Sequence, residues 1–225
     1  MTPREQPRGI AILYEDRDII VVSKAPGLLS IATETDKART AYRLMTDWVR
    51  RRSPKFRERV FIVHRLDRDT SGVLVFARTE EAKRTLQANW DSTEKHYLVV
   101  VHGTLAEKEG TITSYLTENA AFRVYSTPDP SKGLLSRTAY RVIREMSAFS
   151  VLDIELLTGR KNQIRVHLSE KGNPVVGDRK YGKPHDPHKF LALHARSIAL
   201  THPVTGRRMT FEAGVPQHFG RWWRG

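Results

Sequence analysis

The feature that most constrains the fold of this chain is a succession of short apolar runs separated by polar turns. Ile10–Leu13 and Ile19–Val22 flank the polar stretch Glu15–Asp18, a pattern that predicts a strand hairpin. Other runs also predict strands, namely Phe61–Val63, Val73–Ala77, Tyr97–Val101, Thr138–Ile143, Val151–Leu157 and Leu191–Leu200. Strands are therefore expected to dominate the structure.

Helical signals are fewer and scattered. Apolar residues at helical spacing predict a helix over residues 39–51. Thr79 predicts the N-cap of a second helix, because two glutamates follow it in the first turn. A third helix is predicted over Asn162–Lys171, ended by Gly172. Because helices and strands do not alternate regularly, we expect an α+β fold with a mixed, largely antiparallel sheet rather than a doubly wound parallel sheet.

Neither a repeat nor a linker-like stretch divides the sequence. We therefore expect a single domain over residues 1–225, with residues 1–9 as an N-terminal extension. The segment Thr117–Leu135, which holds two prolines and a glycine, is the best candidate for an insertion.

Net charge points to the partner more than to the fold. The formal net charge is +13, and nucleic acid is the commonest partner of so basic a domain, with an anionic membrane surface as the alternative. The chain has no cysteine, which excludes disulfides, thiolate zinc sites and a cysteine nucleophile. Without a secretory signal or a run of roughly 20 apolar residues, we expect a cytoplasmic protein that does not enter the membrane.

The segment His64–Gly72 concentrates reactive groups in a loop between two apolar runs. It holds two carboxylates, three cations and two hydroxyls. One interpretation is a solvated turn with surface ion pairs, which contribute little to stability. The other is a reactive site presented by a rigid scaffold.

A second segment, Thr158–His167, follows an apolar strand and opens the third predicted helix. Free amides at a helix start, together with Arg160 and Lys161, would form a phosphate site. Arg165 falls on the interior side of this helix, where a cation needs a carboxylate partner unless it reaches solvent.

The joint pattern resembles the RluA family of RNA pseudouridine synthases. His64-Arg65-Leu66-Asp67-Arg68-Asp69-Thr70-Ser71-Gly72 is similar to the signature loop of that family at every position. The similarity continues in family order through Lys24–Gly27, Leu157–Arg160, Gln163–His167, Gly172–Pro174, Gly177-Asp178, Tyr181-Gly182 and Leu193–Ala195. The resemblance covers roughly residues 10–213 and implies the pseudouridine synthase fold, with flanking helices and loops around a central basic cleft.

By this resemblance, Asp67 is the catalytic aspartate, Tyr97 the active-site tyrosine and Arg165 the arginine that pairs with the aspartate. Arg65 matches a residue used around the flipped-out nucleotide. Asn162 stands where the family usually has histidine, so no family role passes to it or to Lys161. The resemblance further implies a compact member without an S4 domain, needing no cofactor and no metal.

Structured RNA, either tRNA or rRNA, is the expected substrate, bound without a protein partner by a monomer. The residues expected to grip phosphates are Arg50, Arg51, Arg52, Lys55, Arg57, Arg59, Arg160 and Lys161. Two other functions stay open at this point. One is a catalytically silent RNA-binding module, and the other a metal-dependent hydrolase that uses His185 and His188.

Overall fold

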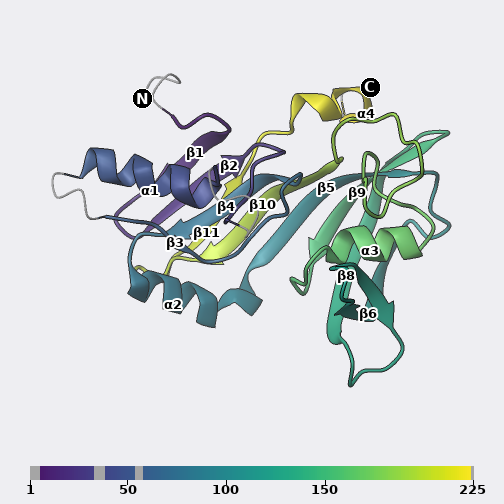
Figure 1. Ribbon diagram of the computed structural model, residues 1–225, viewed down its shortest axis with the longest axis horizontal. Helices are drawn as coiled ribbons and strands as arrows, with labels where there is room; N and C mark the ends of the chain where they lie inside the picture. The colour runs from purple at the N-terminus through teal and green to yellow at the C-terminus, as the bar shows by residue number, and fades with distance from the viewer. Residues whose placement is uncertain (1–5, 33–38, 54–57, 224–225) are drawn as a thin grey trace. The chain divides into compact units, whose positions relative to one another are not determined.

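The computed structural model describes residues 6–32, 39–53 and 58–223. Its contacts divide the chain into two compact units. The first comprises Met1–Thr93 and Ala195–Gly214, and the second comprises Glu94–His194 and Val215–Gly225. Figure 1 shows the elements of both units along the chain. Within the described ranges no helix is long and apolar enough to cross a bilayer.

The first unit is built on a sheet in the order β1-β2-β4-β10, with β3 beside β4 and β11 beside β10. The pairs β1–β2, β2–β4, β3–β4 and β10–β11 are antiparallel. Its strands are β1 (Ile10–Glu15), β2 (Ile19–Lys24), β3 (Phe61–Ile62), β4 (Ser71–Ala77), β10 (Leu193–Thr201) and β11 (Arg208–Glu212). Its helices are α1 (Ala41–Arg52) and α2 (Glu80–Ala88), and the 3-10 turn η2 (Trp90–Ser92) follows α2.

The core of the first unit follows from the strand pattern. Every residue of β4 is buried, so both faces of this strand are covered. Val73 and Val75 project to one face and pack with Ala82 and Leu86 of α2. The Thr79 hydroxyl accepts from the Ala82 amide at 3.0 Å, which confirms the predicted N-cap.

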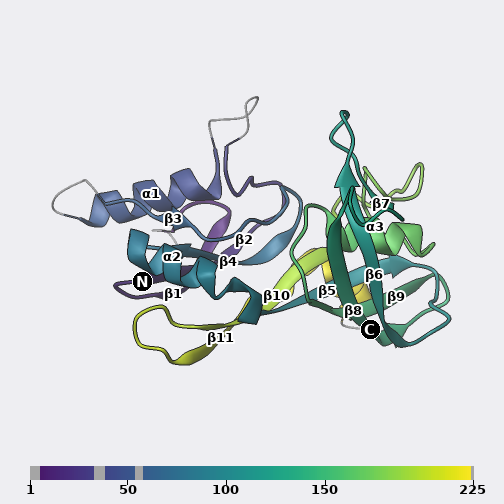
Figure 2. The same cartoon turned by 90° about the horizontal axis from the view of Figure 1, so that it is seen from below.

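The second unit carries an antiparallel sheet in the order β5-β9-β8-β6-β7. Its strands are β5 (Glu94–His102), β6 (Glu109–Glu118), β7 (Val124–Thr127), β8 (Leu134–Glu145) and β9 (Phe149–Leu156). Its helices are α3 (Gln163–Glu170) and α4 (Gly220–Trp223), the latter preceded by the 3-10 turn η3 (Gln217–Phe219). Figure 2 shows α3 beside β6 and β7, where Val166 packs with Leu116, Val124 and Tyr181.

The α+β class with a mostly antiparallel sheet is confirmed. The segment Thr117–Leu135 is more ordered than the predicted insertion, because it holds β7 and the adjoining ends of β6 and β8. Strands β6, β7 and β11 were not predicted. Most residues of β6 are exposed or half-buried, so this strand lacks the apolar run by which the others were found.

Candidate active site

The signature loop lies between β3 and β4 and is fixed by hydrogen bonds to its main chain. The Ser30 hydroxyl donates to the Leu66 carbonyl at 2.7 Å and accepts from the Leu66 amide at 3.0 Å. On the other side of Asp67, the Gly27 amide donates to the Arg68 carbonyl at 2.9 Å. Both neighbours of Asp67 are therefore anchored, which holds the backbone of the aspartate in one place.

Lys24, the last residue of β2, contributes a buried cation to the same loop. Only 1% of this residue is exposed. Its ammonium donates to the carbonyls of Ala25 at 3.1 Å, Leu28 at 2.7 Å and Arg68 at 2.9 Å. Burial lowers the pKa of Lys24 to about 7, and the carboxylates of Asp69 and Asp67 oppose that shift. Lys24 thereby ties the end of β2 to the main chain of the signature loop.

The loop presents its side chains unequally. Leu66 is buried and anchors the loop, Asp67 is half-buried and Arg65 is exposed. Partial burial is compatible with the catalytic role expected for Asp67, because the carboxylate keeps some hydration and stays accessible. Exposure suits an arginine that is expected to reach RNA.

The two ends of the loop are also constrained. At its start, the His64 Nε2 accepts from the Val75 amide at 3.0 Å, and its ring lies 4.6 Å from the Trp90 ring. At its end, Gly72 has a φ of +114°, and a Cβ there would lie 2.0 Å from the Ala195 carbonyl oxygen. Only glycine fits that position, because both the backbone angle and the close approach exclude a side chain.

Arg165 on α3 forms a two-pronged ion pair with Asp178 in the second unit. Its Nε lies 2.7 Å from Asp178 Oδ2 and its Nη2 lies 2.8 Å from Oδ1. The side chains are 11% and 0% exposed, respectively. Burial raises the pKa of Asp178, but hydrogen bonds from Arg165 and from the Tyr181 and Lys180 amides hold it below the usual range. The predicted carboxylate partner of a buried Arg165 therefore exists.

Asp178 was not singled out as that partner, although Gly177-Asp178 was part of the recognised pattern. The need to compensate a buried guanidinium, joined to a carboxylate in that pattern, was the signal that could have identified it. The pairing with Asp178 uses Nε and Nη2 of Arg165. The pairing of Arg165 with Asp67 stays a prediction.

Tyr97 lies in β5, opposite Ile154 of β9. It is 9% exposed. Along β5 successive side chains point to opposite faces, so Tyr97 shares a face with Val99 and Val101 and not with His102. A role for this tyrosine in catalysis stays a prediction.

The start of α3 differs from the predicted phosphate site in one respect. The Arg160 amide is already used, because it donates to the Gln163 side-chain oxygen at 3.0 Å. The same oxygen accepts from the Thr158 hydroxyl at 2.9 Å. Gln163 thus closes the turn before the helix, and any anion contact here must come from side chains rather than from that amide.

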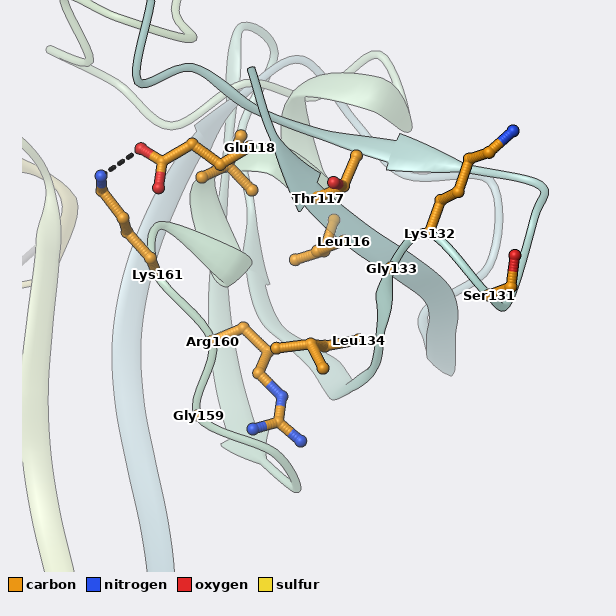
Figure 3. A pocket seen from close by; sticks show the side chains of 11 residues that line it. Leu116, Thr117, Glu118, Ser131, Lys132, Gly133, Leu134, Gly159, Arg160 and Lys161 are labelled. Carbon is orange, nitrogen blue, oxygen red and sulfur yellow. Dashed lines mark hydrogen bonds and ion pairs between the residues drawn. The ribbon is translucent and has the colours of Figure 1, made fainter. Parts of the chain in front are cut away.

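A pocket of about 490 Å³ opens beside this turn (Figure 3). Apolar side chains of Leu116, Val124 and Leu134 contribute to its wall, and the cations Lys132, Arg160 and Lys161 also line it. Lys161 is paired with Glu118, as the dashed line in Figure 3 marks. The residues that line the pocket are Leu116, Thr117, Glu118, Val124, Ser131, Lys132, Gly133, Leu134, Gly159, Arg160 and Lys161.

The predicted basic segment 50–59 is only partly engaged with protein. Arg50, Arg51 and Arg52 form the last turn of α1, where positive charge suits the helix dipole. Arg51 and Arg52 are both exposed, and Arg52 pairs with Glu15 at 3.0 Å. Arg59 stacks over the Phe61 ring at 4.9 Å. The other two predicted residues, Lys55 and Arg57, lie outside the described residues.

Comparison with known proteins identifies the family. A family model described as RNA pseudouridylate synthase matches residues 18–170. The dual-specificity RNA pseudouridine synthase RluA of Salmonella typhimurium is 35% identical over 225 residues, covering 96% of this chain and 97% of that protein. The tRNA pseudouridine synthase C of Haemophilus ducreyi is 31% identical, covering 92% of each chain. The ribosomal large subunit pseudouridine synthase D of Nitrosomonas europaea is 34% identical, and the matched region spans 62% of it.

Solved structures show the same fold. Human RNA pseudouridylate synthase domain containing 4 superposes with a TM-score of 0.79 at 20% identity, covering 95% of this chain and 93% of that one. Human RNA pseudouridylate synthase domain containing 1 gives 0.73 at 25% identity, covering 92% and 84%. Because the family model covers more than half of the chain and full-length relatives exceed 30% identity, this chain belongs to the RNA pseudouridylate synthase family, among its RluA-type members.

Proposed function

We propose that this enzyme converts uridines of folded tRNA or rRNA to pseudouridine, with Asp67 as the catalytic carboxylate. The observation that carries the proposal is the signature loop, in which hydrogen bonds anchor both neighbours of a half-buried aspartate. The names of the relatives, which include a tRNA synthase and a dual-specificity synthase, support both RNA classes as substrates.

The reaction breaks the N1–C1′ glycosidic bond, turns the uracil and joins its C5 to C1′. No atom is lost and no redox change occurs, so this isomerisation requires no redox cofactor. The sugar carbon becomes electron-poor as the bond breaks, and an ionised carboxylate beside it can attack C1′ or remove the C2′ proton. Paired carboxylates perform related work in glycosidases. Here Asp67 alone supplies the carboxylate, because the uracil is recaptured rather than released.

Arg165 and Tyr97 complete the proposed machinery. A guanidinium near Asp67 keeps the aspartate ionised against the effect of burial. Arg165 suits this role, because Asp178 holds its side chain through Nε and Nη2 and thereby orients it. The Tyr97 ring would stack on the uracil, and its hydroxyl would assist the loss of the C5 proton.

The target uridine must leave its stack to reach Asp67. Extrusion costs a few kcal/mol, and least in loops and bulges. Arg65 is exposed and stands two residues before Asp67, so it is placed along the chain to fill the vacated space and stack on neighbouring bases.

The pocket of Figure 3 is proposed as a second contact for the RNA. Its apolar wall, which includes Leu116 and Leu134, suits the face of an unstacked base. The guanidinium of Arg160 at the same pocket suits a phosphate. Recognition of unpaired nucleotides at this pocket would help to select folded RNA over duplex.

Tritium release from 5-tritiated uridine in total tRNA and rRNA tests the proposed function. The wild type should release tritium, and Asp67→Asn should abolish release while RNA affinity stays within a few-fold. Asp91→Asn is the matched control, because this exposed carboxylate of the same unit should be dispensable. Tight binding without release by the wild type would favour the silent RNA-binding module. An Asp67→Asn variant that keeps more than about a tenth of the rate, a loss of under 1.4 kcal/mol, would remove Asp67 from its role.

A further inference from the structure

Three side chains that could ligate a metal converge in the second unit. His102 ends β5, while Asp186 and His188 lie in the loop between α3 and β10. His102 Nε2 lies 2.7 Å from Asp186 Oδ2, and His188 Nδ1 lies 2.5 Å from Asp186 Oδ1. One ligand atom from each residue lies within 4.8 Å of the other two.

From the sequence, His188 is a candidate metal ligand together with His185, three residues earlier. The structure gives His188 a different neighbour, because His185 is exposed and is not a member of the converging group. His102 is distant in sequence, so the spacing of histidines could not identify it. The alternative of a metal-dependent hydrolase rested on the local spacing of His185 and His188.

The three side chains are largely withdrawn from water. Their exposed fractions are 10% for His102, 6% for Asp186 and 12% for His188. The Asp186 carboxylate also accepts hydrogen bonds from the Gly177 amide at 2.8 Å and from the His188 amide at 3.0 Å, in addition to its contacts with both imidazoles.

The Asp186 carboxylate is paired with histidines. Among the residues that the structure describes, its ion-pair partners are the two imidazoles, without a lysine or arginine. Each imidazole nitrogen that faces Asp186 can hold either a proton or a metal ion. A divalent cation shared by the three side chains would compensate the buried carboxylate more completely than hydrogen bonds alone.

A second group of similar composition shows what a purely structural cluster looks like. Asp16, Asp18 and His202 also converge, in the first unit. There the His202 Nδ1 accepts from the Val204 and Thr205 amides at 3.3 Å and 3.1 Å, so its proton is on Nε2 and is donated to Asp16. Main-chain donors fix that tautomer, and a metal would have to displace a fully used proton. This cluster therefore caps a turn, and we assign no ion to it.

Aromatic rings surround the His102–Asp186–His188 group. The His102 ring lies 5.5 Å from Phe149, and the His188 ring lies 5.5 Å from Trp222. Phe149 and Trp222 in turn lie 5.9 Å apart. Such an apolar surround limits water access and strengthens electrostatic attraction at the site.

We propose that His102, Asp186 and His188 bind one divalent transition-metal ion of the zinc class. Two imidazole nitrogens and a carboxylate oxygen are typical ligands of Zn²⁺, whereas Mg²⁺ and Ca²⁺ prefer oxygen alone. A tetrahedral zinc keeps its ligand atoms roughly 3.3 Å apart, so the Asp186 carboxylate must move from each imidazole by under about 1 Å. The ion has three protein ligands and a fourth position for water.

The ion acts on structure rather than on the isomerisation. It ties the loop that carries Asp186 and His188 to the end of β5. His102 is five residues from Tyr97 along that strand, so the two side chains point to opposite faces. The ion therefore does not contact the face that carries Tyr97, and the metal proposal stands or falls independently of the role of Asp67.

Metal content and stability test this site. The untagged full-length chain, stripped with chelator, is dialysed against Zn²⁺ and its metal content measured by mass spectrometry. The wild type should hold about one ion per chain, show a higher unfolding temperature with Zn²⁺, and give the absorption bands of low-coordinate Co²⁺ when Co²⁺ replaces zinc. In His102→Gln and His188→Gln, affinity should fall at least about 100-fold.

Two control variants sharpen the result. His185→Gln lies in the same loop but outside the group, and Asp67→Asn lies in the other unit, so both should bind zinc as the wild type does. Circular dichroism checks that each variant is folded, and His188→Gln, in a loop, is informative even if a strand variant at His102 is not folded. A wild type without zinc above the buffer level, or a folded His188→Gln that still binds one ion with wild-type affinity, would overturn the proposal.

Discussion

The ammonium of Lys24 lies 2.9 Å from the carbonyl oxygen of Arg68, the residue directly after Asp67. The end of β2 and the signature loop are thereby joined through a buried side chain. Lys24 also donates to Ala25 and Leu28, so one side chain holds two separate stretches of main chain together. We infer that Lys24 positions the loop and does not touch substrate.

Replacing Lys24 by methionine removes three hydrogen bonds but keeps most of the volume. We expect Lys24→Met to lower kcat for tritium release at least about tenfold with little change in RNA affinity, because the loop around Asp67 loses its anchor. Lys83→Met on α2 is the control, and it should leave kcat unchanged. Loss of RNA affinity with an unaltered kcat would show that Lys24 serves binding instead.

The same variant gives a pH signature in stability. Burial lowers the pKa of Lys24 to about 7 from an ordinary value of 10.5. Between these two values the unfolded chain holds a proton that the folded chain has lost, so stability rises with pH in this window. The stability of the wild type relative to Lys24→Met should therefore improve as pH rises above about 7, as measured by urea unfolding at several pH values. A difference that is constant with pH would contradict the assignment.

Some elements of the fold could be predicted from residues that are close in sequence, and others could not. The N-cap at Thr79 and the end of α3 before Gly172 were predicted, because capping depends on a few neighbouring residues. Strand β6 was not, because its stability comes from pairing with β8 rather than from an apolar pattern of its own.

The candidate sites likewise contain features that could be predicted from neighbouring residues and features that could not. The loop around Asp67 was identified from contiguous residues. The Arg165–Asp178 pair joins residues 13 positions apart, and His102 and His188 meet only in the fold. Such pairs depend on tertiary packing, which residue spacing does not encode.

Gly72 is expected to tolerate no side chain. In Gly72→Ala the new Cβ would lie 2.0 Å from the Ala195 carbonyl oxygen, and the φ of +114° adds backbone strain. We expect a loss of more than about 3 kcal/mol of unfolding free energy, because main chain on both sides must move. Gly206→Ala is the control, since it has a φ of +69° with nothing within 4 Å and should lose only about 1 kcal/mol. Equal losses in the two variants would mean that the close contact at Gly72 is unimportant.

The Arg165–Asp178 pair can be tested by a double-mutant cycle. Arg165→Met leaves a fully buried Asp178 carboxylate without its guanidinium, which should cost about 3–5 kcal/mol of stability. Adding Asp178→Asn removes the uncompensated charge, so the double variant should regain part of that stability. Activity should not return, because the proposed guanidinium near Asp67 is still missing. Recovery of tritium release together with stability would limit Arg165 to a structural role.

The burial of His167 predicts that the folded protein loses stability in mild acid. This α3 side chain is buried and bonded to the Ser114 and Thr138 hydroxyls, both at 2.9 Å. Burial lowers the pKa of His167 to about 4 from 6.5, so the unfolded chain binds a proton in this window that the folded chain does not. Stability should therefore fall as pH drops from about 6.5 towards 4, and His167→Gln should flatten this dependence in urea unfolding. The exposed His185→Gln should keep the wild-type slope, and an unchanged slope in His167→Gln would assign the effect to other groups.

Arg160 and Lys161 line the same pocket but should differ in their use by RNA. Lys161 is already paired with Glu118, so its charge is partly compensated before RNA binds. Arg160→Gln should weaken RNA binding and reduce the slope of log affinity against log salt by about 0.7, the value for one phosphate contact on single-stranded nucleic acid. Lys161→Gln should change the slope less, because Glu118 competes with phosphate for that ammonium.

Fluorescence anisotropy with tRNA at several salt concentrations measures both slopes. A larger change for Lys161→Gln than for Arg160→Gln would show that RNA displaces Glu118 and that the lysine, not the arginine, is the contact at this pocket.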